Sequence, residues 1–318
     1  MADAAQVLPF LVNGRKVGRV GYGLLGLSVP WAPVSRPDAI KLMKTALENG
    51  ANLWNGSTHY GTPENNSLHL VRDYFDKYPE DAEKVVLMMK GAFTHTGGPD
   101  GSPEGIRAAV EEAIKVLPPS IKTIDVFECG RVDPKVPIEK TVEALAALVK
   151  EGKTQGLGLS EANPNTIRRA HAIHPVSAVE IELSLFTPDP LHNNIVKTCH
   201  ELNIPIAAYS PIGRGWLTGE LRTLDDLPEN DFRRRLPRFQ PENFKQNLKL
   251  VDAISEIAQK KGASTAQISL GWTLSRVEVN CHPANLTGAE MDEIQKIMDT
   301  IPIAGQRYGG KFEEALSG

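Results

Sequence analysis

The sequence has few cysteines, no long apolar run and no excess of charge of one sign. Its three cysteines, Cys129, Cys199 and Cys281, are scattered over 318 residues without CxxC spacing, which excludes a disulfide scaffold and favours a reducing compartment. A net charge of -4 gives no electrostatic reason to expect nucleic acid or an anionic membrane as the main partner. No apolar run approaches membrane-spanning length, and MADAAQVLPF lacks the features of a signal peptide, so we expect a cytoplasmic protein.

Short apolar runs alternate with amphipathic stretches along the chain. The runs predict strands at 17–23, 52–54, 85–90, 124–127, 156–160, 179–183 and 206–209. Helices are predicted from a cap at Ser35 to a stop at Asn49-Gly50, near 68–75, from Ser102, over 137–151, from Asn163-Pro164 and over 190–202. Seven alternations without a break in composition predict a single α/β barrel domain over residues 1–318.

A doubly wound sheet is the alternative fold. The run Gly21-Tyr22-Gly23-Leu24-Leu25-Gly26 has the GxGxxG spacing of a dinucleotide-binding turn. No acidic residue follows at the expected distance after a second strand, and the spacing alone is a weak signal.

Tyr60 and Lys90 each lie just past a predicted strand, about one strand-helix unit apart. The carboxyl ends of neighbouring parallel strands converge on one site. An ammonium beside a phenol favours phenolate and lowers a pKa that is otherwise near 10. Tyr60 with Lys90 is therefore a candidate general acid.

Several other polar residues have a structural and a functional interpretation. We interpret the arginine-rich segment 214–245, with Arg238 among its cations, as a solvated loop; the alternative is a lid or a loop that faces phosphate. His59 is expected to be an exposed loop histidine. Cys129 is expected to be a small buried residue, and its neighbour Glu128 is a candidate pocket residue. His171 and His174 lack further ligands nearby in sequence, so no metal site is expected.

The motifs together resemble the aldo-keto reductases. They are VGRVGYGLLGLS, NLWNGSTHYG, VVLMMKG, TIDVFECGRVDP, GLGLSEANP, VEIELSLF, IAAYSPIGRGWLTG and AQISLGWTLS, in family order over nearly the whole chain. The WNG run before Tyr60 and the RVDP turn are most similar to the pyridoxal reductases of fungi and plants. The resemblance implies a (β/α)8 TIM barrel and NADPH-dependent reduction of an aldehyde to an alcohol, pyridoxal to pyridoxine, in vitamin B6 metabolism.

The resemblance also assigns roles to individual residues. It implies that Tyr60 is the proton donor and that Lys90 tunes it. It places the cofactor-binding residues at Gly23, Leu24, Ser160, Glu180, Ser210, Pro211, Gly213, Gly215, Leu217 and Asn280. No metal is implied, and a small-molecule aldehyde is the expected partner.

The sequence departs from the family pattern around the expected catalytic residues. Asn55 replaces the aspartate that usually pairs with the lysine; an amide accepts a hydrogen bond from Lys90 but does not neutralise it, so we expect a stronger effect of the ammonium on the phenol. Gly130 replaces the usual histidine; if that histidine orients the carbonyl, Arg131 or water substitutes for it, or the activity is weaker. Glu180 replaces an expected glutamine, and Leu183 replaces an aromatic residue.

The largest departure follows Arg276. The family continues with strand eight and a loop that binds the adenosine 2′-phosphate, whereas this chain passes directly to VEVNCHP. We therefore expect a barrel that lacks strand eight and this loop. Three alternatives stay open: an active reductase, a nucleotide-binding scaffold with little turnover, and a nonfunctional truncated product.

Overall fold

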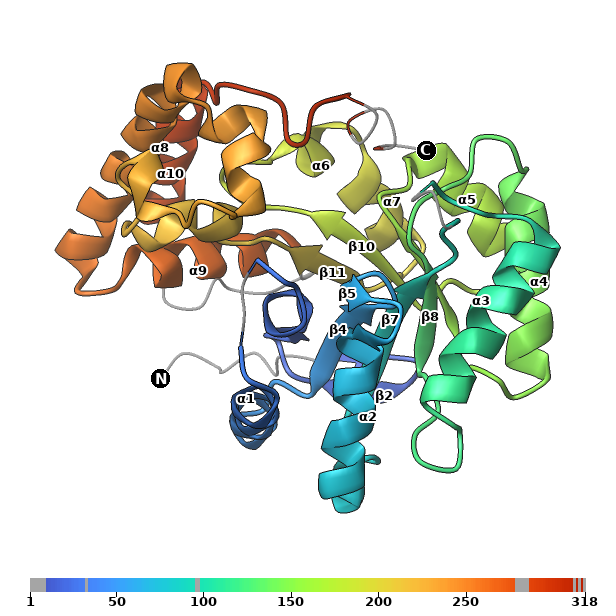
Figure 1. The fold of residues 1–318 in the computed structure, drawn as a ribbon. Coiled ribbons are helices and arrows are strands. Elements are labelled where there is room, and N and C mark those ends of the chain that lie inside the picture. Colours follow the sequence, from blue (N-terminus) through green and yellow to red (C-terminus); the bar gives the residue numbers. More distant parts are fainter. Residues whose placement is uncertain are drawn as a thin grey trace, which may run out of the picture. The chain divides into compact units, whose positions relative to one another are not determined.

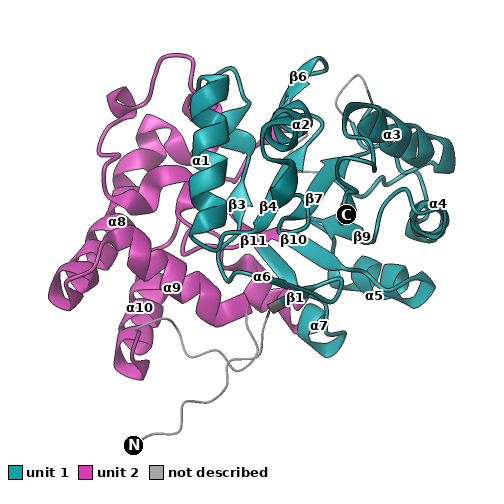
Figure 2. Cartoon of the chain, turned by 90° about the horizontal axis from the view of Figure 1, so that it is seen from below, with its two compact units in different colours: residues 1–180, 198–207, 317–318 teal, residues 181–197, 208–316 magenta. Residues whose placement is uncertain are grey.

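The computed structural model describes residues 10–31, 34–94, 98–277, 286–310, 313 and 316. They group into two compact units, coloured separately in Figure 2. Unit 1 comprises residues 1–180, 198–207 and 317–318, and unit 2 comprises 181–197 and 208–316. The predicted single domain over the whole chain stays a prediction.

A seven-stranded sheet runs through the chain in the order β11-β10-β9-β8-β7-β4-β3 (Figure 1). Its strands are β3 (Tyr22–Gly23), β4 (Leu53–Ser57), β7 (Val86–Gly91), β8 (Val126–Cys129), β9 (Leu157–Ser160), β10 (Ala178–Glu182) and β11 (Ile206–Tyr209). The paired strands from β3 to β10 are parallel. Because the order follows the chain and never reverses, the doubly wound alternative is wrong. The fold is of the (β/α)8 TIM-barrel type, with seven strands in the part of the chain that is described.

Helices follow the strands of unit 1 and lie alongside them (Figure 1). They are α1 (Arg36–Glu48), α2 (Ser67–Lys77), α3 (Pro103–Val116), α4 (Ile138–Lys150) and α5 (Pro164–Ile173). The predicted caps are confirmed: Ser35, Ser102 and Asn163 each accept a hydrogen bond from a backbone N–H of the first turn. A proline in the first turn of each of these three helices has the backbone angle that a helix start requires.

Two predicted elements are divided in the structure. The predicted strand 17–23 contains β3, but its start belongs to β2 (Arg15–Val17), which pairs antiparallel with β1 (Phe10–Val12). Asn13 and Gly14 both have positive φ, which a tight hairpin turn requires. The predicted helix 190–202 is broken into α6 (Asp189–His192) and α7 (Ile195–Glu201), because Asn194 adopts a left-handed conformation.

The core of unit 1 joins the hairpin to the sheet. One buried cluster contains Val12 and Val17 of the hairpin region and side chains from β4, β7, β8 and β10. All six residues of β7 are buried, including Lys90. A charged group in such a strand requires a partner inside the protein, since burial of an unpaired charge is costly.

In the described residues of unit 2, four short 3-10 helices are followed by longer α-helices. The short ones are η3 (Gly213–Thr218), η4 (Leu224–Asp226), η5 (Phe232–Arg235) and η6 (Pro237–Phe239); the others are α8 (Pro241–Lys261), α9 (Thr265–Val277) and α10 (Gly288–Thr300). The interpretation of 214–245 as a solvated loop is wrong, because Trp216 packs against Phe239 and Phe244, and the Arg238 side chain is only 13% exposed.

Unit 1 also contains short elements outside the seven-stranded sheet. Two short strands, β5 (Gly61–Thr62) and β6 (Asn65–Asn66), form a hairpin, and η1 (Leu25–Leu27) and η2 (Pro79–Asp81) are 3-10 helices.

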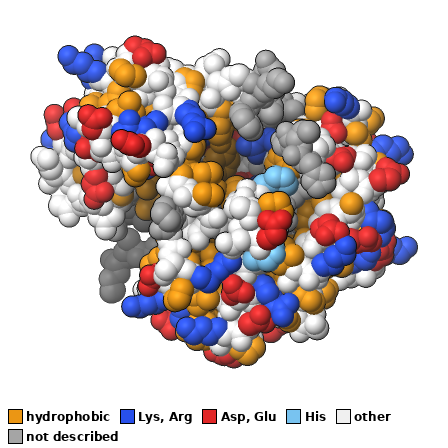
Figure 3. Space-filling model, viewed as in Figure 1, with side chains coloured by type: hydrophobic (Ala, Val, Ile, Leu, Met, Phe, Trp, Pro, Cys, Tyr) orange, Lys and Arg blue, Asp and Glu red, His pale blue; other side chains and the backbone are white. Residues whose placement is uncertain are grey.

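The surface view shows charges of both signs interleaved on the visible face (Figure 3). This distribution agrees with the near balance of 35 basic and 39 acidic residues. None of the helices within the described ranges combines the length and apolarity needed to cross a bilayer.

Candidate active site

The loop after β4 holds Tyr60 by its backbone on both sides. The Tyr60 amide donates to the Ser57 carbonyl at 3.2 Å, and its own carbonyl accepts from the Ser67 amide at 3.0 Å. The following hairpin begins at Gly61, which has φ 128°; a side chain there would meet the Asn65 carbonyl at 2.2 Å, so only glycine fits. The loop therefore fixes Tyr60 next to the end of the strand.

Lys90 reaches Tyr60 from the neighbouring strand. Its Nζ lies 5.1 Å from the centroid of the Tyr60 ring. The loop and β7 are also joined directly, because the Thr58 amide donates to the Lys90 carbonyl at 3.0 Å. The structure thus brings together the two residues that the sequence singled out.

The Lys90 ammonium is paired with a buried carboxylate. Its Nζ lies 2.8 Å from Oε2 and 3.0 Å from Oε1 of Glu180, and it donates to Asn55 Oδ1 at 2.5 Å. Asn55 Nδ2 in turn donates to Glu180 Oε2 at 2.7 Å. The three side chains, from β4, β7 and β10, form a closed hydrogen-bonded ring.

This ring corrects the expectation of an ammonium without a counter-charge. Asn55 accepts from Lys90 as predicted, but Glu180 supplies the negative charge that the amide lacks. Burial would lower the pKa of Lys90; the Glu180 carboxylate outweighs it, and the pKa of Lys90 is raised. For Glu180, burial acts to raise the pKa, yet Lys90 prevails and lowers it. Lys90 and Glu180 are therefore both charged at neutral pH.

A second acid, Glu128, is buried in the same region. It is the neighbour of Lys90 in the pairing of β7 with β8, and its exposure is 0%. Burial first, and Glu180 second, raise the pKa of Glu128 well above its usual range. Of the two acids, Glu180 is the one paired with Lys90, whereas burial favours the neutral form of Glu128.

The space beside Gly130 is filled by a phenylalanine. A Cβ at Gly130 would lie 2.3 Å from Cε2 of Phe93, so a larger residue would displace this ring. Phe93 itself contacts the exposed ring of His59 at 4.6 Å between centroids. Arg131, the predicted substitute, donates to Ser160 Oγ at 3.1 Å and to the Gly130 carbonyl at 2.6 Å.

The predicted cofactor residues of unit 1 have different surroundings. Ser160 is buried and holds Arg131, while Glu180 is engaged by Lys90 and Asn55. Gly23 lies in β3, and Leu24 donates its amide to the Asn55 carbonyl at 2.8 Å while its side chain is fully buried. Asn280 lies outside the described residues.

The predicted phosphate-binding turn of unit 2 has an unusual backbone. Ser210, Gly213, Arg214 and Gly215 all have positive φ, and Pro211 and the buried Leu217 lie in the same turn. Three amides of the turn donate within it: Gly213 to the Ser210 carbonyl, and Gly215 and Leu217 to the Ile212 carbonyl. That the turn binds a phosphate group stays a prediction. A Cβ at Gly213 would lie 2.9 Å from the Phe186 ring, which explains the need for glycine there.

Sequence reasoning missed a cluster of arginines around Glu182 in unit 2. Arg214 Nη2 lies 2.8 Å and Arg307 Nη2 lies 3.0 Å from Glu182 Oε2, and Arg238 lies at 3.9 Å from Oε1. Arg214 also donates to the Arg307 carbonyl, which ties the C-terminal segment to η3. The sequence did contain a signal for this cluster: two acids, Glu180 and Glu182, lie inside the apolar strand AVEIE. Buried charges require partners, so basic residues were to be expected near them.

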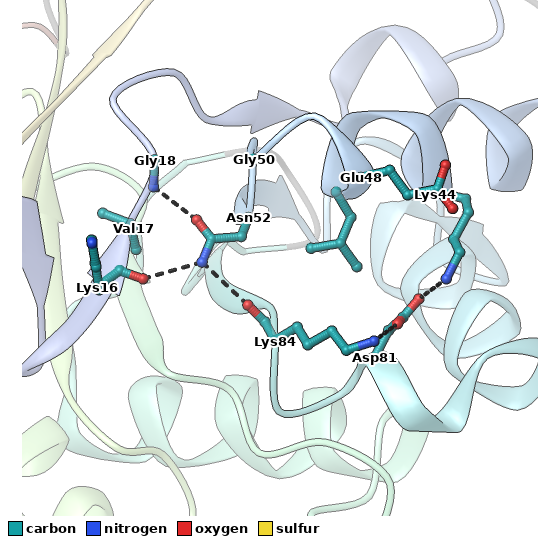
Figure 4. Close-up of a pocket in the computed structure, with 10 residues that line it drawn as sticks. Lys16, Val17, Gly18, Lys44, Glu48, Gly50, Asn52, Asp81 and Lys84 are labelled. Carbon is teal, nitrogen blue, oxygen red and sulfur yellow. Dashed lines mark hydrogen bonds and ion pairs between the residues drawn. The ribbon is translucent and has the colours of Figure 1, made fainter.

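A pocket of about 490 Å³ lies at the other end of the strands in unit 1 (Figure 4). Asn52, just before β4, binds the Gly18 amide and the carbonyls of Lys16 and Lys84 there. Asp81 accepts from Lys44 and Lys84, each at 2.8 Å. These contacts join β2, α1 and the start of β7, so the pocket is a structural crevice and lies away from Tyr60 and Lys90.

The expectation that Cys129 is a small buried residue is confirmed. Burial raises the pKa of Cys129 to about 12, so its thiol is an inert core group. Trp54 is fully buried and packs against Tyr74 and Phe75.

Comparison with known proteins places these features in a family. Residues 19–304 match the model of the aldo/keto reductase family. The chain is 39% identical to a probable pyridoxal reductase 2 of Schizosaccharomyces pombe, over 96% of this chain and 99% of the relative. It is 36% identical to a probable aldo-keto reductase 1 of Glycine max, over 98% and 94% of the two chains. A glycerol dehydrogenase structure from Gluconobacter oxydans has the same fold, with a TM-score of 0.79, 23% identity and coverage of 95% of this chain and 99% of that chain.

The chain-order parallel sheet, the family match and the relatives above 30% identity agree with one another. The chain therefore belongs to the aldo/keto reductase family.

Proposed function

We propose that the protein reduces an aldehyde to an alcohol with NADPH, that pyridoxal is the substrate and pyridoxine the product, and that Tyr60 donates the proton. The observation that carries this proposal is the buried ring of Lys90, Glu180 and Asn55 beside Tyr60. The aldo/keto reductase match and the similarity to a protein described as a probable pyridoxal reductase support it. Vitamin B6 metabolism in the cytoplasm is the corresponding biological role.

Residues of unit 1 have different roles at the carbonyl oxygen. Tyr60 donates its phenolic proton to that oxygen as negative charge develops on it. The Lys90 ammonium stabilises the phenolate left behind, and Glu180 with Asn55 holds the ammonium in place. Lys90 is 4% exposed, so water screens its charge little, and the Glu180 carboxylate offsets part of that charge.

We assign contacts with the nicotinamide to Ser160, whose hydroxyl accepts from Arg131. Contacts with the phosphate are assigned to the 210–217 turn, whose backbone has positive φ angles at Ser210, Gly213, Arg214 and Gly215. When bound, the cofactor supplies the hydride that the carbonyl carbon receives. The side chains of this protein position the substrate and the cofactor and supply the proton.

The direct test compares two tyrosine variants. We expect Tyr60→Phe to lower the rate of pyridoxal reduction by about 10²–10⁴-fold, the usual contribution of a positioned general acid. Tyr78→Phe at the end of α2 removes the same hydroxyl outside the site and serves as the matched control. Turnover by Tyr60→Phe at the rate of the control would refute the assignment of the proton donor.

A second function has specific support. The alignment with the fission-yeast relative spans 333 positions, more than the 318 residues of this chain, so the relative has segments that this chain lacks. The sheet has seven strands in the described residues, as expected if strand eight and the 2′-phosphate loop are lost. A nucleotide-binding scaffold without turnover would have these features.

Titration with NADPH and with NADH, followed by tryptophan fluorescence, separates the two functions. Tight NADPH binding together with pyridoxal turnover supports the reductase. Binding without turnover on a panel of aldehydes supports the scaffold. Failure to bind either nucleotide would contradict both.

A further inference from the structure

Glu128 is a buried acid that the proposed mechanism does not use. Both of its carboxyl oxygens are inaccessible to solvent, and neither has a hydrogen-bond partner of normal geometry. A carboxyl group left in this state is costly to ionise, because no donor replaces the lost water.

The sheet is built to accommodate this side chain. Glu128 pairs in register with Gly158 of β9, and a Cβ at Gly158 would lie 2.8 Å from Glu128 Cγ. The glycine thus leaves the space that the glutamate side chain occupies. Glu128 is held in this place by the packing of the strands around it.

The groups that act on Glu128 come from strands on both sides of β8. Lys90 on β7 is its neighbour in register, and Glu180 on β10, the strand beyond β9, raises its pKa as a second acid. Gly158 on β9 contributes no charge. Two carboxyl groups and one ammonium share a dry space, and like charges this close do not both ionise readily.

We propose, on the basis of the reductase function argued above, that Glu128 is a positioning residue that shares one proton with Glu180 and so keeps the total charge beside Lys90 and Tyr60 at zero. The proton sits on Glu128 and points its O–H toward the Glu180 carboxylate. Glu180 then receives donors from Lys90, Asn55 and Glu128, which fixes it against the ammonium.

The shared proton has a consequence for the pH dependence of the reaction. Loss of this proton to solvent at high pH adds a negative charge to the ring. That charge opposes the formation of phenolate at Tyr60, so Tyr60 becomes a weaker acid and reduction slows. Glu128→Gln keeps a neutral group of the same size that has no acidic proton, and it removes this source of the alkaline decline.

The first experiment measures kcat/KM for pyridoxal against pH in the wild type, in Glu128→Gln and in Glu104→Gln, a control on the exposed side of α3. Each profile is scaled to its own value at neutral pH. We expect the alkaline decline of Glu128→Gln to begin at least about one pH unit higher than in the other two proteins, a difference of about tenfold in relative rate at high pH. Three superimposable profiles would overturn the proposal.

The second experiment does not depend on activity or cofactor. Infrared spectroscopy of the wild type at neutral pH should show the carbonyl band of a buried protonated carboxylic acid, and Glu128→Gln should lack it. Glu180→Gln should also lose the band, because Glu128 then ionises to replace the partner of Lys90. A band that persists in both variants would contradict the proposal, even if one variant were poorly folded. If the wild type reduced no aldehyde, the proposed function would fail while the infrared band would still decide the state of Glu128.

Discussion

Glu180→Gln tests whether the carboxylate of β10 has taken over the role of the aspartate that Asn55 replaces. Lys90 and Glu180 are each 4% exposed, and the ammonium lies 2.8 Å from Oε2. Removal of one partner of a buried pair costs about 3–5 kcal/mol, because the other charge is left uncompensated. Ionisation of Glu128 relieves part of this cost, so we expect a loss of about 2–3 kcal/mol in the free energy of unfolding.

The double variant Asn55→Asp/Glu180→Gln should restore most of the loss. The exchange returns one carboxylate and one amide to the ring, and the Asn55–Glu180 hydrogen bond is kept with donor and acceptor reversed. We expect its stability to lie within about 1 kcal/mol of the wild type. Urea unfolding followed by tryptophan fluorescence measures all three proteins, with Glu104→Gln as the surface control. The reasoning is refuted if Glu180→Gln is as stable as the control, or if the double variant is no more stable than Glu180→Gln.

Three further predictions concern other parts of unit 1. Gly158→Ala should destabilise the protein by about 1–3 kcal/mol, because the new Cβ would lie 2.8 Å from Glu128 Cγ; Gly288→Ala, where a Cβ meets nothing within 4 Å, is the control, and equal urea midpoints for both would show that the space at Gly158 is not needed. Asp81 is buried; burial acts to raise its pKa, but bonds from Lys44, Lys84 and Tyr74 lower it to about 2. Its folded pKa is thus below the unfolded value of about 3.9, so its stabilising effect is present above about pH 4 and is lost as the pH falls toward 2; urea midpoints should fall more steeply in this range for the wild type than for Asp81→Asn, and parallel curves would contradict the assignment. Cys129, with its pKa raised to about 12 by burial, should react with a thiol reagent at neutral pH only after unfolding; rapid labelling of the folded protein at this residue would be inconsistent with an inert core thiol.

Local chemistry made much of the fold predictable. Ser35, Ser102 and Asn163 begin helices because their side chains accept the first free backbone N–H groups. The hairpin at Asn13-Gly14 was overlooked although it had a recognisable turn signal. The break at Asn194 had no comparably strong signal, since asparagine only sometimes adopts the left-handed conformation.

The partners of buried charges depend on contacts between residues far apart in the chain. Glu180 was expected at the cofactor, and in the structure it pairs with Lys90, 90 residues away. The arginine segment was interpreted as solvated, yet the Arg238 side chain is only 13% exposed and lies near Glu182. In both cases the residue type indicated a charge that needs a partner, and the choice among several partners followed from strand register and packing.

By itself the sequence determined the alternation of strands and helices, the caps that begin the helices, and the pairing of Tyr60 with Lys90 at neighbouring strand ends. These follow from the period of apolar residues and from the rule that parallel strands end on one side of the sheet. Only the tertiary structure decided that Glu180 neutralises Lys90, that Phe93 fills the space beside Gly130, and that no donor reaches the buried carboxyl oxygens of Glu128. Such pairings are set by distances of a few ångströms between side chains of different strands, and the order of residues along one strand does not specify them.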